Sequence, residues 1–572
     1  MNKKVLVIII LVTVVIGGYL YLRYSVLKSK DFKPDLSKSK SELDLRPALI
    51  AKMRQLVKDG SNGLYNLHIT QVEPSVTQSS VDFVGVVLTP DSSGLARLDS
   101  LQMAPDDVFK ISFKALHIGG IGISDLLNKK EIDLTSIIVD EPVIEVFHQE
   151  RSYNADKRLQ NDTLTLYQKI TRNFSSIAIN KILVKGGRFI SHTAKNNKTT
   201  SYKNVSIQLS DLLIDSSSQY DANRFLFAKK ADFSVGKYSL PTPDSLYFFS
   251  CNSVTVSAEN RRLTATGIEL TPRFTKDAFQ QKIQRRQDRY TIKIPKLVLS
   301  GVDWWKLVNN DKLIARQADI YNGSLSDYVD MRKPAKEFKV NNYPHQAIMN
   351  IKMPINIEKI QMHNMSVTYE ELSSVSLKPG TVYFDNINGE MRNITNMPAE
   401  FGNKNLTFTA KALFMKKAPI TVDFKLNLAK HKTGNFSADI RAGAIDHSIP
   451  NKLAEPLGLF NLKSGNIKEA TAHMYGDNNQ VTSDFLMLYN NLYVIPMKKD
   501  EEVKGGLKKK KLVGALANLL LIKDANPDKS GDVRRFKYVV QRKQHPNFFN
   551  QLWKTLLTGI LKTIGAPEKL AK

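Results

Sequence analysis

The chain has 572 residues, with 82 Lys and Arg against 55 Asp and Glu, which gives a net charge of +27 at pH 7. The positive charge is spread along the chain without a basic motif interleaved with aromatic residues, which argues against a nucleic-acid partner. The single cysteine, Cys251, excludes an internal disulfide.

The N-terminus contains an uncharged apolar segment, which runs from Val5 to Leu22 between flanking basic residues. This is about the length that crosses ~30 Å of hydrocarbon. Few small residues follow the apolar core where a signal peptide would be cut, so we expect an uncleaved anchor over residues 1–30.

The orientation of this anchor is a separate question, because more basic residues follow the span than precede it. A positive-inside count would leave the bulk of the chain in the cytoplasm, yet long soluble regions translocate largely regardless of charge. We therefore expect a single-pass protein of the inner membrane with its bulk in the periplasm.

Residues 31–77 are expected to hold a helix, over roughly 45–59, and a first strand. Beyond them, much of the sequence occurs twice at a spacing of about 181 residues. Five segments recur in order, which predicts tandem β repeats over 78–260 and 261–440, a period far longer than the roughly 20–50 residues of ordinary solenoids. The matched segments are Gly85–Pro90 with Gly267–Pro272, Lys114–Ile121 with Pro295–Val302, Ile179–Ile182 with Ile357–Ile360, Tyr202–Val205 with Phe384–Ile387, and Phe227–Ala231 with Phe408–Ala412.

The repeats have the alternation of apolar and polar residues that is typical of half-buried strands. In the clearest case, Phe424, Leu426 and Leu428 alternate with polar residues, the chain turns, and Phe436 to Ile440 alternates on the way back. Similar runs recur along the chain, with few predicted helices, one of them over roughly 155–174. The sequence therefore predicts a mainly β protein.

The C-terminal part divides into a β region over 441–545 and an amphipathic helix over 546–572. Residues 507–522 combine a lysine run with apolar positions, which fits either a partly buried element or a basic interfacial helix. In the final helix, Phe549, Trp553, Leu556 and Ile560 share one apolar face, which fits either contact with a membrane or capping of the sheet.

The high positive charge has two interpretations. Lysines on the solvent face of many strands discourage edge pairing. They would also attract anionic membrane surfaces, at roughly 1 kcal/mol per residue near the surface.

Catalytic and metal-binding signals are weak. The ten histidines never stand at an i,i+4 metal spacing, and no G-x-S-x-G elbow occurs. Gly119–Gly122 lacks the full pattern of a phosphate-binding loop and reads as a turn. We expect no enzyme activity, no metal site and no cofactor.

Several of these patterns together resemble the AsmA-like envelope family, the AsmA, TamB and YhdP type of bridge-like lipid-transfer proteins. They are the N-terminal span, Leu116–Ile121 followed by Leu126–Leu127 and Ile132–Leu134, the strand pair over Ile137–Val146, Ser464–Ile467, Leu488–Val494, and the tail from Phe548 to Gly559. The resemblance covers nearly the whole chain. It implies a long twisted antiparallel β-sheet groove, anchored in the inner membrane and lined by apolar residues.

The partners that the resemblance implies are lipids, the inner membrane, and an outer membrane or outer-membrane protein. A long sheet with one apolar face must either close into sandwiches or curl into a trough that holds lipid, because large exposed apolar patches are rare. The candidate lining residues of such a trough are Val205, Ile207, Leu209, Ile357 and Ile360. Three functions are compatible with this pattern: transport of phospholipids in support of outer-membrane lipid homeostasis, assembly of outer-membrane proteins, and a structural or adhesive β-sandwich.

Overall fold

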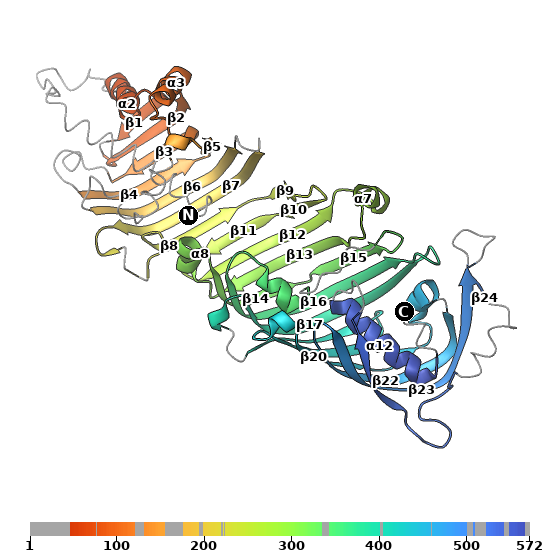
Figure 1. Ribbon diagram of the computed structural model, residues 1–572. Helices are drawn as coiled ribbons and strands as arrows, with labels where there is room; N and C mark the ends of the chain where they lie inside the picture. The colour runs from red at the N-terminus through yellow and green to blue at the C-terminus, as the bar shows by residue number, and fades with distance from the viewer. Residues whose placement is uncertain are drawn as a thin grey trace, which may run out of the picture. The chain divides into compact units, whose positions relative to one another are not determined.

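The structure is a computed structural model, and it describes most of the chain between Arg46 and Ala566. The described residues are 46–75, 77–120, 131–154, 176–193, 198–218, 221, 223–334, 342–400, 404–458, 460–499, 507–509, 522–542 and 548–566. The expected anchor over 1–30, the expected helix over 155–174 and most of the segment 507–522 lie outside them. The described residues are mainly β, as predicted (Figure 1).

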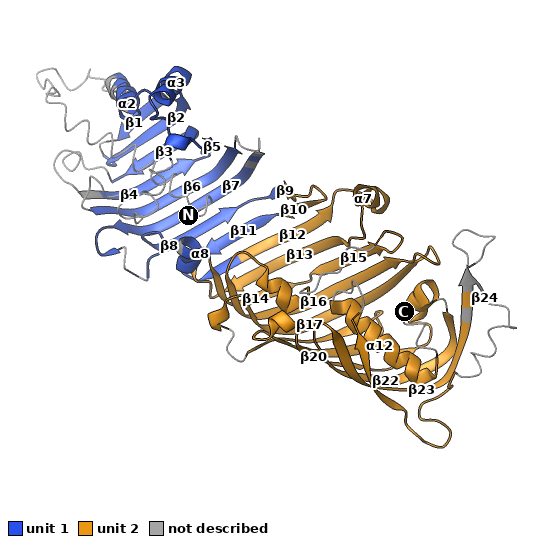
Figure 2. Ribbon diagram, in the orientation of Figure 1, with its two compact units in different colours: residues 1–238, 251–263, 304–311 blue, residues 239–250, 264–303, 312–572 orange. Residues whose placement is uncertain are grey.

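The chain divides into two compact units (Figure 2). Unit 1 contains residues 1–238, 251–263 and 304–311, and unit 2 contains residues 239–250, 264–303 and 312–572.

The elements that begin in unit 1 include the helix that was predicted over 45–59, here α2. They are α2 (Arg46–Gly60), β1 (Tyr65–Ser75), β2 (Ser80–Pro90), α3 (Ser92–Ser100), β3 (Asp107–Gly119), β4 (Glu131–Asp140), β5 (Val143–His148), η1 (Ser152–Asn154), β6 (Ser176–Thr193), β7 (Lys198–Ile214), β8 (Ala228–Val235), β9 (Tyr238–Pro241), β11 (Ser253–Ser257), β12 (Arg262–Pro272) and α8 (Trp304–Asn310).

The elements that begin in unit 2 include the longest strands of the protein. They are β10 (Tyr247–Cys251), α7 (Lys276–Lys282), β13 (Arg289–Ser300), β14 (Leu313–Tyr321), β15 (Ser324–Asp330), α9 (Pro344–Met349), β16 (Ile355–Leu372), β17 (Pro379–Thr395), η4 (Pro398–Glu400), β18 (Asn405–Phe414), β19 (Ala418–Asn427), η5 (His431–Thr433), β20 (Phe436–Ala442), β21 (Ile445–Asp446), α10 (Asn451–Leu453), η6 (Ala454–Gly458), β22 (Phe460–Gly476), β23 (Gln480–Lys499), β24 (Leu507–Lys509), β25 (Arg535–Gln541) and α12 (Phe548–Ile564).

Local sequence accounts for where several of these elements begin and end. Asp91 precedes α3 and its carboxylate accepts a hydrogen bond from the Gly94 N–H at 2.7 Å, which caps the first turn. The predicted hairpin is formed by β19 and β20, which pair with Phe424 opposite Ala438. The turn between these strands ends at Gly434, whose φ of 72° is left-handed and favours glycine.

Each unit contains a mixed sheet, whereas an antiparallel sheet was expected. In unit 1, β3 pairs antiparallel with β2, β4 and β5, whereas β4 and β5 both pair parallel with β6. In unit 2, β14 and β15 likewise pair parallel with β16. Long connections, over 149–175 and 331–354, precede β6 and β16, and such connections permit the parallel pairing that a tight hairpin cannot make.

The order of pairing within unit 1 recurs within unit 2. Strand β13 pairs with β14 and β15, these pair with β16, and β16 to β18 follow one another as β6 to β8 do. Registers match as well, since Ile182 lies opposite Leu209 and the corresponding Ile360 lies opposite Met391.

Two left-handed glycines lie in the same topological context. Gly120, with φ 83°, follows β3, and Gly301, with φ 69°, follows β13. A Cβ at Gly120 would lie 2.5 Å from the backbone nitrogen of Thr135, and a Cβ at Gly301 would lie 2.7 Å from the Cβ of Arg316. Each glycine therefore permits close approach to the corresponding position of the next strand.

One of the five sequence matches is shifted in the structure. The register of β7 and β8 places Leu209 opposite Ala231, and the register of β17 and β18 places Met391 opposite Phe408. Phe408 is therefore the counterpart of Ala231 and not of Phe227. The difference of four residues arises in the connection between these strands, which covers 215–227 before β8 and 396–404 before β18. Strand pairing does not fix the length of such a connection.

Candidate functional site

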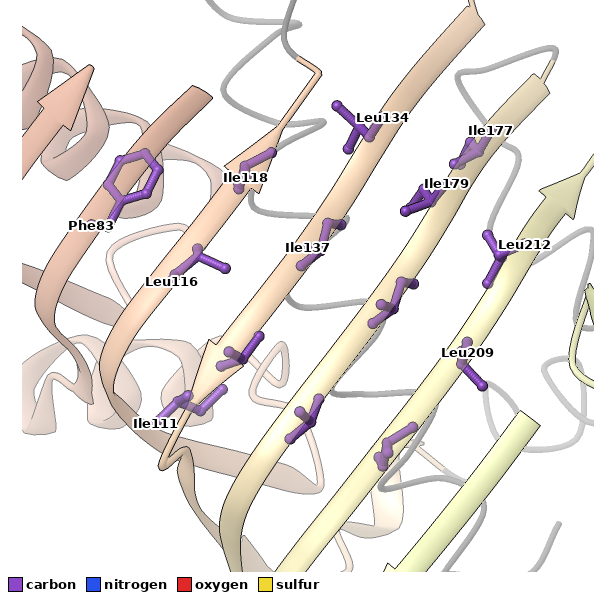
Figure 3. Packing of buried hydrophobic residues seen from close by; sticks show 14 of the residues in the cluster. Phe83, Ile111, Leu116, Ile118, Leu134, Ile137, Ile177, Ile179, Leu209 and Leu212 are labelled. Atoms are coloured by element: carbon purple, nitrogen blue, oxygen red, sulfur yellow. The ribbon is translucent and has the colours of Figure 1, made fainter. Parts of the chain in front are cut away.

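One face of the sheet in unit 1 is apolar across consecutive strands (Figure 3). Strand registers arrange its residues in apolar rows that run across the strands, each residue opposite the next. One apolar row consists of Phe83, Leu116, Val139, Val184, Ile207 and Phe233. The neighbouring apolar row consists of Val81, Ile118, Ile137, Ile182, Leu209 and Ala231.

The three lining residues that were predicted on β7 share this face. Ile207 and Leu209 lie in adjacent apolar rows and are each 1% exposed. Val205 is half-buried, lies opposite Gly187 and packs against the same cluster. An open face was expected here, but these two central positions are shielded from solvent in this structure.

The apolar rows of unit 2 are longer. One consists of Leu297, Ile320, Met362, Gly389, Ala410, Val422, Ile440, Ala472, Phe485 and Phe536. The next consists of Leu299, Ala318, Ile360, Met391, Phe408, Phe424, Ala438, Met474, Ser483 and Tyr538, with Ser483 as its one small polar residue. At ~4.8 Å between neighbouring strands, each row spans roughly 40 Å.

Both predicted lining residues of β16 are at least partly buried. Ile360 is half-buried within the second row, and Ile357 is 9% exposed between Ala315 and Ile394. The two residues are three apart, although residues on one face of a regular strand are two apart. Between them the pairing of β16 is interrupted at Glu358 without a shift of register, and Asn393, at the corresponding position of β17, has a left-handed φ of 59°.

A polar group interrupts the apolar face near the ends of three strands of unit 2. Asp327 on β15 lies opposite Tyr290 on β13 and Tyr369 on β16. The Tyr290 hydroxyl donates to Asp288 at 2.9 Å, and the Tyr369 hydroxyl donates to Glu371 at 2.7 Å. These donors are thus directed away from Asp327.

Asp327 is consequently a half-buried carboxyl with a raised pKa. Its Oδ1 atom is buried and has no hydrogen-bond partner among the described residues. Desolvation, followed by repulsion from Asp288, raises the pKa of Asp327 to about 7. The corresponding position of unit 1, opposite Phe109, is Val146, which is 8% exposed.

Helix α12 packs against the apolar face of unit 2 at its last strands. Leu552 and Leu561 join the same core cluster as Phe485 and Tyr538. A Cβ at Gly559 would lie 2.4 Å from the Tyr538 hydroxyl and 2.6 Å from Phe485 Cγ, so glycine permits this close approach of helix and sheet. The Tyr538 hydroxyl donates to the Thr555 carbonyl at 2.7 Å.

The four residues predicted to touch a membrane are divided between the two sides of α12. Phe549 is 64% exposed and Trp553 is 40% exposed, whereas Leu556 and Ile560 are half-buried against the cluster. The sequence left open whether this helix caps the sheet or contacts a membrane. In the structure one side caps the sheet and the other leaves two large aromatic residues in solvent.

Two features of this face were missed from sequence. Asp327 alternates with Leu325 and Val329 on β15, so the alternation was a signal that it shares their face. The packing of Tyr343 against Phe436 and Phe548 joins segments far apart in the chain and has no local signal.

Among the described residues, no three His, Cys, Asp or Glu side chains are grouped so as to hold a metal ion. No helix within the described residues is both long and apolar enough to cross a membrane. Neither a family model nor a curated protein matches this sequence.

Proposed function

We propose that this protein is an inner-membrane-anchored, AsmA-like envelope protein that carries phospholipids along an apolar β-groove and so supports outer-membrane lipid homeostasis. The observation that carries the proposal is the set of apolar rows that cross consecutive strands in each unit. Each acyl CH₂ kept out of water contributes about 0.8 kcal/mol wherever it lies along such a row. An acyl chain would therefore slide along it with little change in free energy.

The proposal includes two tandem β units over 78–260 and 261–440. Matched pairing order, matched registers and the equivalent left-handed glycines Gly120 and Gly301 support a duplication. A duplicated unit would provide a similar apolar face in each copy, so that each copy could hold an acyl chain.

The proposal also includes two membrane contacts. Val5 to Leu22 would anchor the chain in the inner membrane, on the basis of its length and lack of charge. The exposed Phe549 and Trp553 of α12 would contact a lipid surface, where aromatic residues are favoured.

Site-specific photocrosslinking in cells tests the proposed function. A photoreactive phenylalanine analogue at Ile360 faces the apolar row, whereas the same analogue at the neighbouring Gln361 faces the polar side, where Gln361 contacts Glu390. We expect labelled phospholipid to be crosslinked at Ile360 and not at Gln361. Equal labelling at both positions, or none at Ile360, would contradict lipid transport.

The same experiment separates the alternatives. Crosslinks from Ile360 to an outer-membrane protein would favour the assembly function. A closed β-sandwich has less support, because the described pairings within each unit form one series of neighbouring strands and not two facing sheets.

A further inference from the structure

Helix α12 occupies the place that an acyl chain would need at the end of the apolar rows. Gly559 lies against Phe485 and Tyr538, which belong to the two rows of unit 2. Figure 1 shows α12 lying along this last part of the sheet. The helix and an acyl chain therefore cannot cover these strands together.

The side of α12 that faces the sheet is rich in small and polar residues. Thr555 and Thr563 are each 0% exposed, yet their hydroxyls donate within the helix, to Gln551 O and Gly559 O, at 2.8 Å each. These hydroxyls would keep their partners if the helix left the sheet. Gln551 Oε1 is buried without a partner among the described residues, and such a group weakens docking.

The opposite side of α12 is apolar at its N-terminal half. Phe549 and Trp553 are exposed to solvent while the helix is docked. A helix with apolar residues on both sides suits a lipid surface as well as it suits the sheet. Two environments of similar kind therefore compete for it.

The two ends of α12 are held differently. At the C-terminal end, the Lys523 N–H donates to Ile564 O at 2.8 Å, and Arg534 Nε donates to Thr563 O at 3.2 Å. At the N-terminal end, the Phe548 ring packs against three rings outside the helix. These are Tyr343, Phe424 and Phe436, with centroid distances of 5.2, 5.8 and 5.0 Å. Backbone carbonyls of the helix accept hydrogen bonds at the C-terminal end, whereas the N-terminal end is held by aromatic packing and by one long hydrogen bond from Gln551 Nε2 to Val540 O at 3.4 Å.

We propose that α12 is a gate on the lipid track, with Phe548 as its latch. When Phe549 and Trp553 enter a lipid surface, Phe548 leaves the three rings and the helix turns about its C-terminal end. The strands from β22 to β25 are then open to an acyl chain. This inference rests on the proposed function, because it regulates the same track.

A disulfide that locks the gate provides the test. The double substitution Phe485→Cys and Gly559→Cys, in full-length protein with Cys251→Ser, places two thiols at positions that are already in contact, and Tyr538→Phe in the same protein removes the hydroxyl that a Cβ at residue 559 would meet at 2.4 Å. We expect oxidation to reduce lipid transfer between vesicles at least tenfold and reduction to restore it. Each single-cysteine protein should be insensitive to the oxidant.

A second measurement does not depend on transfer. In the reduced double-cysteine protein, vesicles of anionic phospholipid should slow disulfide formation severalfold, because the helix then leaves the sheet. Slower formation in a protein that transfers no lipid would support the gate and contradict the proposed function. Unchanged formation, or full transfer by the locked protein, would overturn the gate.

A variant of the latch provides a test that does not depend on the folding of the double-cysteine protein. Phe548→Leu keeps an apolar side chain and removes the ring packing, so we expect it to speed lipid transfer. Transfer at the wild-type rate by a folded Phe548→Leu protein would also overturn the proposed role of the latch.

Discussion

Asp327 is the residue whose chemistry departs most from its surroundings. Its pKa of about 7 means that the folded protein holds a proton on this carboxyl at a pH where the unfolded chain has lost it. The stabilising contribution of the neutral form is therefore complete below about pH 4 and is lost as pH rises through about 7.

Replacing Asp327 by Asn removes this titration. We expect the variant to be more stable than wild type at pH 8, by on the order of 2 kcal/mol, and to show little difference at pH 4. Thermal unfolding of both proteins across this pH range measures the effect. Glu73 is an exposed carboxylate, so Glu73→Gln is a matched control that should leave the pH profile unchanged. A wild-type profile that is flat between pH 4 and 8 would contradict the role of Asp327.

Alternation predicted the side on which Ile207 and Leu209 lie, because both are on a regular stretch of β7. It does not place Ile357 and Ile360 on one face, because they are three residues apart and the irregular backbone between them, opposite the left-handed Asn393, has no signal in the local alternation. The shielding of Ile207 was not predictable either, because burial depends on parts of the chain that are distant in sequence.

At the scale of elements, α12 shows why a helical pattern alone could not decide between two locations. Its periodicity predicted the element and its apolar face, but Leu552 and Leu561 also form an apolar side with small residues between them. The sequence alone could not show which side of the helix packs against the rest of the protein. The docked position follows from Gly559, which permits contact with Phe485.

The fluorescence of Trp553 reports whether α12 also meets a membrane. Trp304 and Trp305 are first replaced by Phe, which leaves Trp553 as the one tryptophan of the chain. Because Trp553 is 40% exposed, its emission should begin in the range of a hydrated indole and shift to the blue when anionic vesicles are added. Added salt should weaken this response, since basic residues contribute roughly 1 kcal/mol each near the surface. An emission that is indifferent to vesicles would leave α12 as a cap of the sheet alone.

At the scale of the whole molecule, the proposed duplication is also supported by individual hydrogen bonds that recur at equivalent positions. The Tyr65 hydroxyl accepts a hydrogen bond from the Phe109 N–H at 3.1 Å, and the Tyr247 hydroxyl accepts one from the Tyr290 N–H at 3.3 Å. Burial raises the pKa of both phenols. Each tyrosine begins a strand whose register with its partner is the same, since Tyr65 lies opposite Pro90 and Tyr247 opposite Pro272.

Equivalent positions should respond in the same direction and by a similar amount to the same change. We expect Tyr65→Phe and Tyr247→Phe each to lower the free energy of local opening by about 1 kcal/mol, because each leaves a backbone N–H without its acceptor. Hydrogen exchange of the peptides that contain Phe109 and Tyr290 measures this in the full-length protein. Tyr493, which is 55% exposed, provides the control, and Tyr493→Phe should change neither peptide. The Tyr247 hydroxyl also donates to Asp288 O at 3.2 Å, so the second copy should lose slightly more. If exchange became faster in only one of the two peptides, the two tyrosine hydroxyls would have different roles. This support for the duplication would then be lost.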